Sequence, residues 1–102
     1  MGVRSFALMC FENEKPLRGQ LGEWDWKLLG SFTRLLRNGV FQGTPGECTY
    51  VPIQWNEDSL HFLIVGRGSN DRNRFSEIEL QKIQRQVKEL GLINLQIEGE
   101  PQ

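Results

Sequence analysis

The sequence predicts an α/β domain in which a mixed β-sheet carries helices on both faces. Strand-like and helix-like segments follow one another in the order βαββαβ, a pattern that builds such layered folds. Two of the strand-like segments, residues 3–11 and 60–65, are apolar almost throughout, and strands of this kind are usually buried on both faces. The same order also fits the ferredoxin-like split βαβ, a two-layer α+β sandwich, so this alternative stays open. The length of 102 residues allows a single domain over residues 1–102.

The first strand, residues 3–11, leads through a loop with Pro and Gly into a helix predicted over residues 21–38. Apolar side chains recur along this helix at intervals of three and four residues, which places them on one face: Leu21, Trp24, Leu28, Phe32, Leu35 and Leu36. Gly39 follows at the position where many helices end in a left-handed residue. Trp26 lies well off the apolar face, so it either covers a second surface or faces water.

A glycine-rich segment, residues 39–47, joins this helix to the next strand, and we call it the hinge. Its three glycines permit positive φ angles where the chain reverses from helix into sheet. Phe41 is expected to fill the seam between helix and sheet. Glu47 is expected to accept hydrogen bonds from N–H groups of the glycine-rich turn. We therefore interpret the hinge as a structural connection, not as a ligand loop.

Two further strands are predicted over residues 49–55 and 60–65, separated by a polar turn. Ser76 then begins a second helix as its N-cap, and Glu79 follows three residues later, which is the pattern of a capping box. Polar and apolar residues alternate over residues 92–97, which predicts the last strand.

Composition and charge restrict the class of protein. The net charge of -1 and the pI of about 5.8 argue against a general affinity for nucleic acid or for an anionic membrane. No apolar run approaches the roughly 20 residues that span a bilayer, and the first residues lack a signal-peptide cleavage site, so a cytoplasmic location is expected. Cys10 and Cys48 are expected to be unpaired thiols, and residues 99–102 a flexible tail.

A longer pattern resembles a known family. The matching residues are "EKPLRG…DWKLLGSFTRLLRNGVFQGTPGECTYVPI" followed by "HFLIVGRGSNDRNRFSEIELQKIQRQVKELGLINLQI". In this pattern a helix is followed by Phe41-x-Gly43 and Gly46-Glu47. An apolar strand then ends in Val65-Gly66-x-Gly68, and a second helix follows it. This order is similar to the N-terminal domain of the leucyl (cytosol) aminopeptidases. The resemblance implies a macro-like α/β domain.

The resemblance also implies a function. Leucyl aminopeptidases cleave peptides with two metal ions held by a separate C-terminal domain, and this chain contains no stretch that resembles their metal-ligand motif. We therefore expect no peptidase activity, no metal and no cofactor. The chain is expected to be a non-catalytic binding or assembly module that acts through self-association or a partner protein. Some members of the family use this domain to contact DNA, which the net charge argues against here.

The alternative function is binding of a nucleotide or of ADP-ribose by the loop over residues 66–74. This loop follows an apolar strand, and open α/β sheets usually place ligands at the carboxyl ends of their strands. Two glycines would let the backbone approach a ligand, and three arginines would attract an anion. The candidate residues are Gly66, Arg67, Gly68, Arg72 and Arg74. The interpretation we favour for this segment is a solvated loop without a ligand.

Two tryptophans are candidates for a protein interface. Trp26 lies off the apolar helix face and Trp55 ends a predicted strand, and exposed aromatic side chains are common anchors of interfaces. His61 is the one histidine, and a single histidine inside a strand is most simply a packed residue. A nucleophilic Cys–His pair would require Cys10 or Cys48 beside it with an orienting third group.

Overall fold

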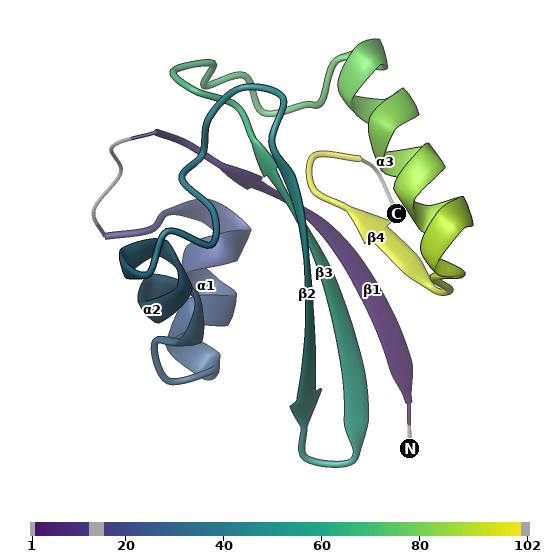
Figure 1. Ribbon diagram of the computed structural model, residues 1–102. Helices are drawn as coiled ribbons and strands as arrows, with labels where there is room; N and C mark the ends of the chain where they lie inside the picture. Colours follow the sequence, from purple (N-terminus) through teal and green to yellow (C-terminus); the bar gives the residue numbers. More distant parts are fainter. Residues whose placement is uncertain (1, 13–15, 101–102) are drawn as a thin grey trace.

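The structure is a computed structural model that describes residues 2–12 and 16–100. Its elements are, in chain order, β1 (Val3–Cys10), α1 (Gly19–Lys27), α2 (Ser31–Arg37), β2 (Cys48–Trp55), β3 (Asp58–Gly66), α3 (Glu77–Leu90) and β4 (Leu95–Ile97). The strands form one mixed sheet in the order β2-β3-β1-β4, with α1 and α2 on one face and α3 on the other (Figure 1). The predicted α/β fold class is therefore confirmed, and the two-layer ferredoxin-like alternative is wrong.

The two central strands are β1 and β3, which pair in parallel over the whole length of β1. Successive side chains of a strand point to opposite faces of the sheet. In β1, Phe6 and Leu8 pack toward α1 and α2, whereas Ala7 and Met9 pack beneath α3. Since helices cover both faces, both sets of side chains are buried. This is why the sequence of β1 is apolar without alternation.

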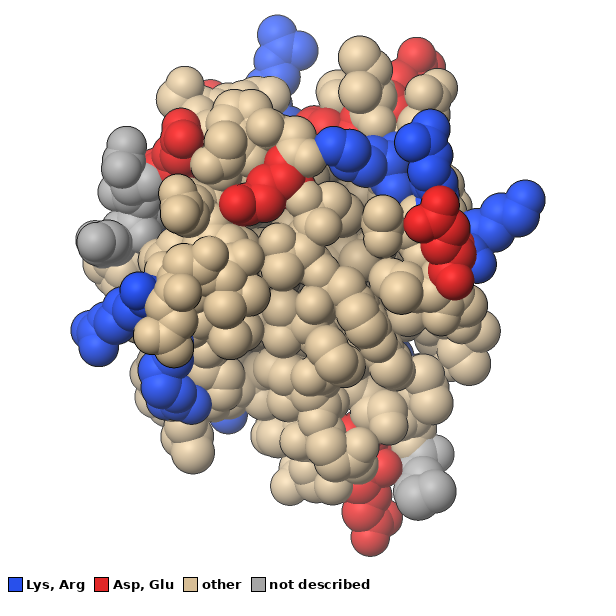
Figure 2. Space-filling view, viewed as in Figure 1, with Lys and Arg blue, Asp and Glu red and all other residues tan. Residues whose placement is uncertain are grey.

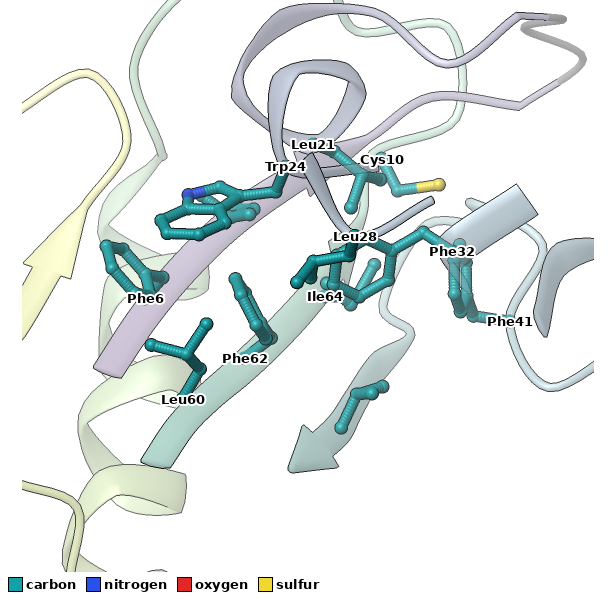
Figure 3. Close-up of a cluster of buried hydrophobic side chains, with 12 residues drawn as sticks. Phe6, Cys10, Leu21, Trp24, Leu28, Phe32, Phe41, Leu60, Phe62 and Ile64 are labelled. Carbon is teal, nitrogen blue, oxygen red and sulfur yellow. The ribbon is translucent and has the colours of Figure 1, made fainter. Parts of the chain in front are cut away.

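The larger core lies between the sheet and the α1–α2 pair, and aromatic rings dominate it (Figure 3). Phe62 of β3 has ring contacts with Phe6, Trp24 and Phe32 at centroid distances of 5.3, 5.5 and 4.9 Å. Phe41 of the hinge is fully buried at the edge of this cluster, where its ring faces Phe32. The prediction that Phe41 fills the seam between helix and sheet is confirmed.

The prediction of a single helix over residues 21–38 is wrong, because the chain forms α1 and α2 there. Leu29 and Gly30 have φ angles of 58° and 81°, in the left-handed region, and they end α1 before α2 begins. The Asp25 carboxylate then accepts hydrogen bonds from the backbone N–H and the hydroxyl of Thr33, in the first turn of α2, at 2.9 and 2.6 Å. Both helices cover the same core, so the apolar periodicity continues across the break and conceals it.

The second predicted helix is α3, and its capping box is confirmed. The Ser76 hydroxyl accepts from the N–H of Glu79, and the Glu79 carboxylate accepts from the N–H of Ser76. The last strand is Leu95–Ile97, shorter than the predicted residues 92–97. Asn94 explains part of the difference, because its φ angle of 56° is left-handed and its side chain bonds back to β1.

The predicted tail, residues 99–102, lies partly outside the described residues, which end at position 100. Glu100 is part of a turn, since its N–H donates to the carbonyl of Ile97 at 3.1 Å. Gly99 packs against the backbone of Asn73, where an added Cβ would lie 2.1 Å from the carbonyl oxygen. The described end of the chain is thus tied to the loop that follows β3.

The sheet topology defines the place where a site is expected. β1 runs parallel to both β3 and β4, so the carboxyl ends of these three strands lie at one edge of the sheet. Open α/β sheets usually bind ligands at that edge. None of the helices in the described part of the chain is long and apolar enough to cross a bilayer.

Candidate functional site

The chain itself covers much of the carboxyl edge of the sheet. The hinge crosses this edge, and backbone hydrogen bonds hold it to the end of β3 and to the residues that follow β3. The N–H of Gly66 donates to the carbonyl of Glu47 at 2.7 Å, and the N–H of Gly68 donates to the carbonyl of Gly43 at 2.8 Å. The N–H of Arg67 donates to the carbonyl of Cys10 at 2.9 Å. These three N–H groups are therefore already occupied.

The hinge is held in turn by Glu47. Its carboxylate accepts hydrogen bonds from the N–H groups of Gln42 and Gly43 at 2.9 and 2.8 Å, which confirms the predicted role of this residue. The hinge is a structural connection, as its composition predicts.

The two glycines of the candidate ligand loop are explained by the hinge. A Cβ on Gly66 would lie 2.0 Å from the carbonyl oxygen of Thr44, and a Cβ on Gly68 would lie 2.6 Å from the ring of Pro45. Both distances are far inside van der Waals contact. The close approach that glycine permits here is an approach of the protein to its own backbone.

Arg67 is buried and binds groups of its own chain. Its side chain donates to both oxygens of Glu79 at 3.0 and 3.1 Å and to the carbonyl of Arg74 at 2.9 Å, and also to the carbonyl of Arg72. The guanidinium also lies over the ring of Phe75 at 5.4 Å. Arg67 therefore fastens the loop after β3 to the first turn of α3.

The contact with Arg67 helps to lower the pKa of the Glu79 carboxyl. Burial alone would raise the pKa of Glu79, but hydrogen bonds from Arg67 and from the N–H of Ser76, with the charge of Arg67, outweigh it. The pKa of Glu79 is consequently lower than its ordinary value. Arg72 and Arg74, by contrast, have exposed side chains. Of the three arginines in the candidate loop, the structure turns one inward and leaves two at the surface.

A cavity of about 470 Å³ lies where the hinge, the loop after β3 and the first turns of α3 meet. We call it the hinge cavity, and its volume is within the range of small-molecule sites. Gly66 and Arg67 contribute to its wall, but Gly68, Arg72 and Arg74 do not. The other residues of its wall are Pro45, Gly46, Val65, Ser69, Asn70, Ile78, Glu79 and Lys82.

A second cavity, of about 660 Å³, lies at the carboxyl end of β4 and includes Glu98. Sequence reasoning missed this residue because it stands beside the predicted tail. Its carboxylate accepts from the N–H of Met9 at 2.9 Å. Burial raises the pKa of Glu98 above its ordinary value, although hydrogen bonds from Met9 and Gln20 act in the opposite direction. The available signal was an acidic residue directly after a short strand.

We expect Glu98→Gln to change how stability depends on pH. The pKa of Glu98 is higher in the folded protein than in the unfolded chain. The contribution of this carboxyl to stability is therefore fully present below the ordinary glutamate pKa. It is lost as the pH rises through the raised pKa of the folded state. The melting temperature of the wild type should therefore fall relative to that of the variant as pH increases from about 4 to 7. Thermal unfolding of both proteins across this range measures the difference, and parallel curves would contradict the assignment.

The second candidate region is the corner between α1 and α2, residues 26–30, which we call the knuckle. Trp26 and Leu29 are each 84% exposed. Trp26 therefore faces water and does not cover a second surface of the domain. Leu29 is also held in a left-handed conformation, which is costly for a residue with a side chain.

The backbone of the knuckle is nonetheless well hydrogen bonded. The N–H of Gly30 donates to the carbonyl of Asp25 at 2.8 Å, and the Ser31 hydroxyl donates to the carbonyl of Leu28 at 2.6 Å. The Arg34 guanidinium donates to the carbonyl of Leu29 at 2.8 Å. Together with the Asp25–Thr33 bonds of α2, these contacts hold the backbone that carries the exposed apolar pair.

Trp55, the other predicted interface residue, lies apart from the knuckle. It is half-buried against the larger core, and its ring meets Trp24 edge-on at 5.5 Å. Trp24 lies on the core-facing side of α1, whereas Trp26 lies on the exposed side. The structure therefore does not bring Trp26 and Trp55 into one surface.

The nucleophilic Cys–His pair considered from the sequence does not form among the described residues. His61 pairs with Tyr50, whose hydroxyl lies 2.7 Å from Nδ1. Cys10 is buried in the larger core and Cys48 is half-buried against the cluster beneath α3, on opposite faces of the sheet, so no disulfide joins the two. Within residues 2–12 and 16–100, no group of three His, Cys, Asp or Glu side chains is placed to hold a metal ion.

Comparison with known proteins adds no family to these observations. No protein-family model matches the chain, and no curated protein or solved structure matches it. The resemblance to the N-terminal domain of leucyl aminopeptidases rests on the residue pattern alone.

Proposed function

We propose that the protein is a non-catalytic assembly module that associates with a second copy of itself through the knuckle. The observation that carries this proposal is the pair Trp26 and Leu29, each 84% exposed on a corner whose backbone is hydrogen bonded. Tryptophan is enriched among the residues that contribute most to protein–protein binding. Because the backbone of the knuckle is already ordered, association has to immobilise only the side chains.

A second copy of the chain can supply the surface that covers this pair. An apolar pair on one copy can pack against the same pair on another across a two-fold axis, which is the commonest symmetry of soluble oligomers. The Asp25 carboxylate needs no hydrogen-bond donor from the second copy, because it already accepts two bonds from Thr33. The resemblance to the N-terminal domain of leucyl aminopeptidases, which lies outside the catalytic centre in that family, supports a non-catalytic role.

Binding of nucleic acid has less support. On the face shown in Figure 2, Lys and Arg side chains form a group at the upper right, where acidic side chains lie beside them, and the middle of the face carries no charged side chain. The net charge of -1 agrees with this distribution. Binding of a nucleotide or ADP-ribose by residues 66–74 also has less support, because Arg67 is engaged with Glu79 and the loop carbonyls.

Sedimentation equilibrium of the wild type and of Trp26→Ala tests the proposal. We expect a concentration-dependent dimer in the wild type. The dissociation constant of the variant should be larger by a factor of at least about thirty, since truncating one central anchor costs about 2 kcal/mol and a symmetric dimer loses two. The variant should keep its fold because the side chain is exposed.

Ile93→Ala is the matched control for this experiment. Ile93 is also an exposed apolar residue, at 57%, but it lies after α3 and near the sheet face opposite the knuckle. Its removal should leave the dimer unchanged. A wild type that stays monomeric at several hundred micromolar, or equal dissociation constants for Trp26→Ala and wild type, would contradict self-association.

A further inference from the structure

The hinge cavity has features of a ligand site that are independent of the knuckle. Its floor is the carboxyl end of β3, one wall is the hinge, and the other wall is the exposed side of the first turns of α3. Ile78 of α3 stands beside it with 78% of its surface exposed. Pro45 and Val65 add apolar surface from the hinge and from the strand. A ligand that enters this cavity would meet mainly hydrocarbon along its length.

Among the described residues that line the cavity, the charged side chains leave one cation without a countercharge. Arg67 and Glu79 neutralise each other through a two-bond ion pair. Lys82, one turn along α3 from Glu79, donates one hydrogen bond to the carbonyl of Gly46, so its ammonium keeps further N–H donors. Among the described residues that line the cavity, Glu79 is the one acidic side chain. The net charge of the wall is therefore positive by one unit.

The backbone N–H groups at the end of β3 and at the capping box are already used, so they are not offered to a phosphate chain. The backbone N–H groups of Gly66 and Arg67 already donate to Glu47 and Cys10. The capping box of Ser76 occupies donors at the beginning of α3. Phosphate sites usually combine several free backbone N–H groups with arginine or lysine. A single carboxylate, in contrast, needs no more than the ammonium provides.

We infer that the hinge cavity binds a small hydrophobic carboxylate, such as a medium-chain fatty acid or an arylalkanoic acid. The carboxylate would bind the ammonium of Lys82, and the hydrocarbon would lie against Pro45, Val65 and Ile78. This ligand satisfies both the single positive charge and the apolar wall.

Isothermal titration calorimetry with octanoate tests this inference. We expect a dissociation constant below about 1 mM for the wild type and about a tenfold weaker one for Lys82→Gln, which is the effect of losing one charge-assisted hydrogen bond. Octanol has a hydrocarbon chain of the same length but no charge for Lys82 to attract. Its dissociation constant for the wild type should therefore be no smaller than that of octanoate for Lys82→Gln.

Lys88→Gln is the matched control, because Lys88 is an exposed lysine of α3 that does not line the cavity. It should bind octanoate as the wild type does, and so should Trp26→Ala, since the site does not depend on the knuckle. Three results would overturn the inference: no heat of binding with octanoate, equal affinity of wild type and Lys82→Gln, or tighter binding of ADP-ribose than of octanoate.

Discussion

Replacing Arg67 with methionine is expected to lower the free energy of unfolding by about 3 kcal/mol or more, because removal of one partner from a buried ion pair typically costs 3–5 kcal/mol. The variant leaves the carboxylate of Glu79 without its cation and the carbonyls of Arg72 and Arg74 without their donor. The Arg67 side chain is 1% exposed, so water cannot replace these contacts easily. Urea unfolding at 25 °C measures the change.

Further variants make this experiment specific. Arg72→Met removes an exposed arginine of the same loop and should change stability by no more than about 0.5 kcal/mol. Glu79→Met removes the same ion pair and also the bond to the N–H of Ser76, so Arg67→Met with Glu79→Met should lose less stability than the sum of the two single losses. If Arg67→Met were as stable as the wild type, Arg67 would not hold the loop to α3. That result would favour a role of Arg67 in binding an anionic ligand.

The second large effect is expected at Gly66. In Gly66→Ala the new methyl group would lie 2.0 Å from the carbonyl oxygen of Thr44 and 2.8 Å from the carbonyl carbon of Gly43. Both neighbours are backbone atoms, so no change of side-chain rotamer relieves the contact. We expect the hinge to move away from β3 and the free energy of unfolding to fall by about 2–3 kcal/mol, the upper part of the range for overpacking.

Gly39→Ala separates this steric effect from the ordinary cost of replacing glycine. An added Cβ at Gly39 meets nothing within 4 Å, but its φ of +74° is left-handed, so the variant should lose only about 1 kcal/mol. Urea unfolding of the two variants under the same conditions gives the comparison. A loss at Gly66 no larger than that at Gly39 would contradict the close approach of the hinge.

The sequence predicts correctly those parts of the fold that depend only on residues close together in the chain. The apolar runs of β1 and β3 indicate burial on both faces, and helices do cover both faces. The capping box needs only Ser76 and Glu79 at the right spacing. The break between α1 and α2 could not be predicted from periodicity, because Leu28 and Phe32 belong to the same core on either side of it.

The candidate site shows the opposite situation, in which the meaning of a residue depends on distant partners. An arginine between two glycines after a strand is compatible with anion binding and with an internal ion pair. The choice depends on Glu79, twelve positions away, which serves the capping box and Arg67 at once. Lys82 reaches the hinge across 36 positions of sequence, so the hinge cavity has no local pattern either.

Burial of Trp26 on association is the central claim, and ¹⁹F NMR of protein labelled with 5-fluorotryptophan measures it most directly. Trp24 and Trp55, which pack in the core, serve as internal references. We predict that the Trp26 resonance, assigned with Trp26→Phe, shifts with protein concentration and loses its H₂O/D₂O isotope shift, while the other two stay constant. A Trp26 resonance that keeps the isotope shift of a solvent-exposed ring at every concentration would contradict the proposed assembly surface.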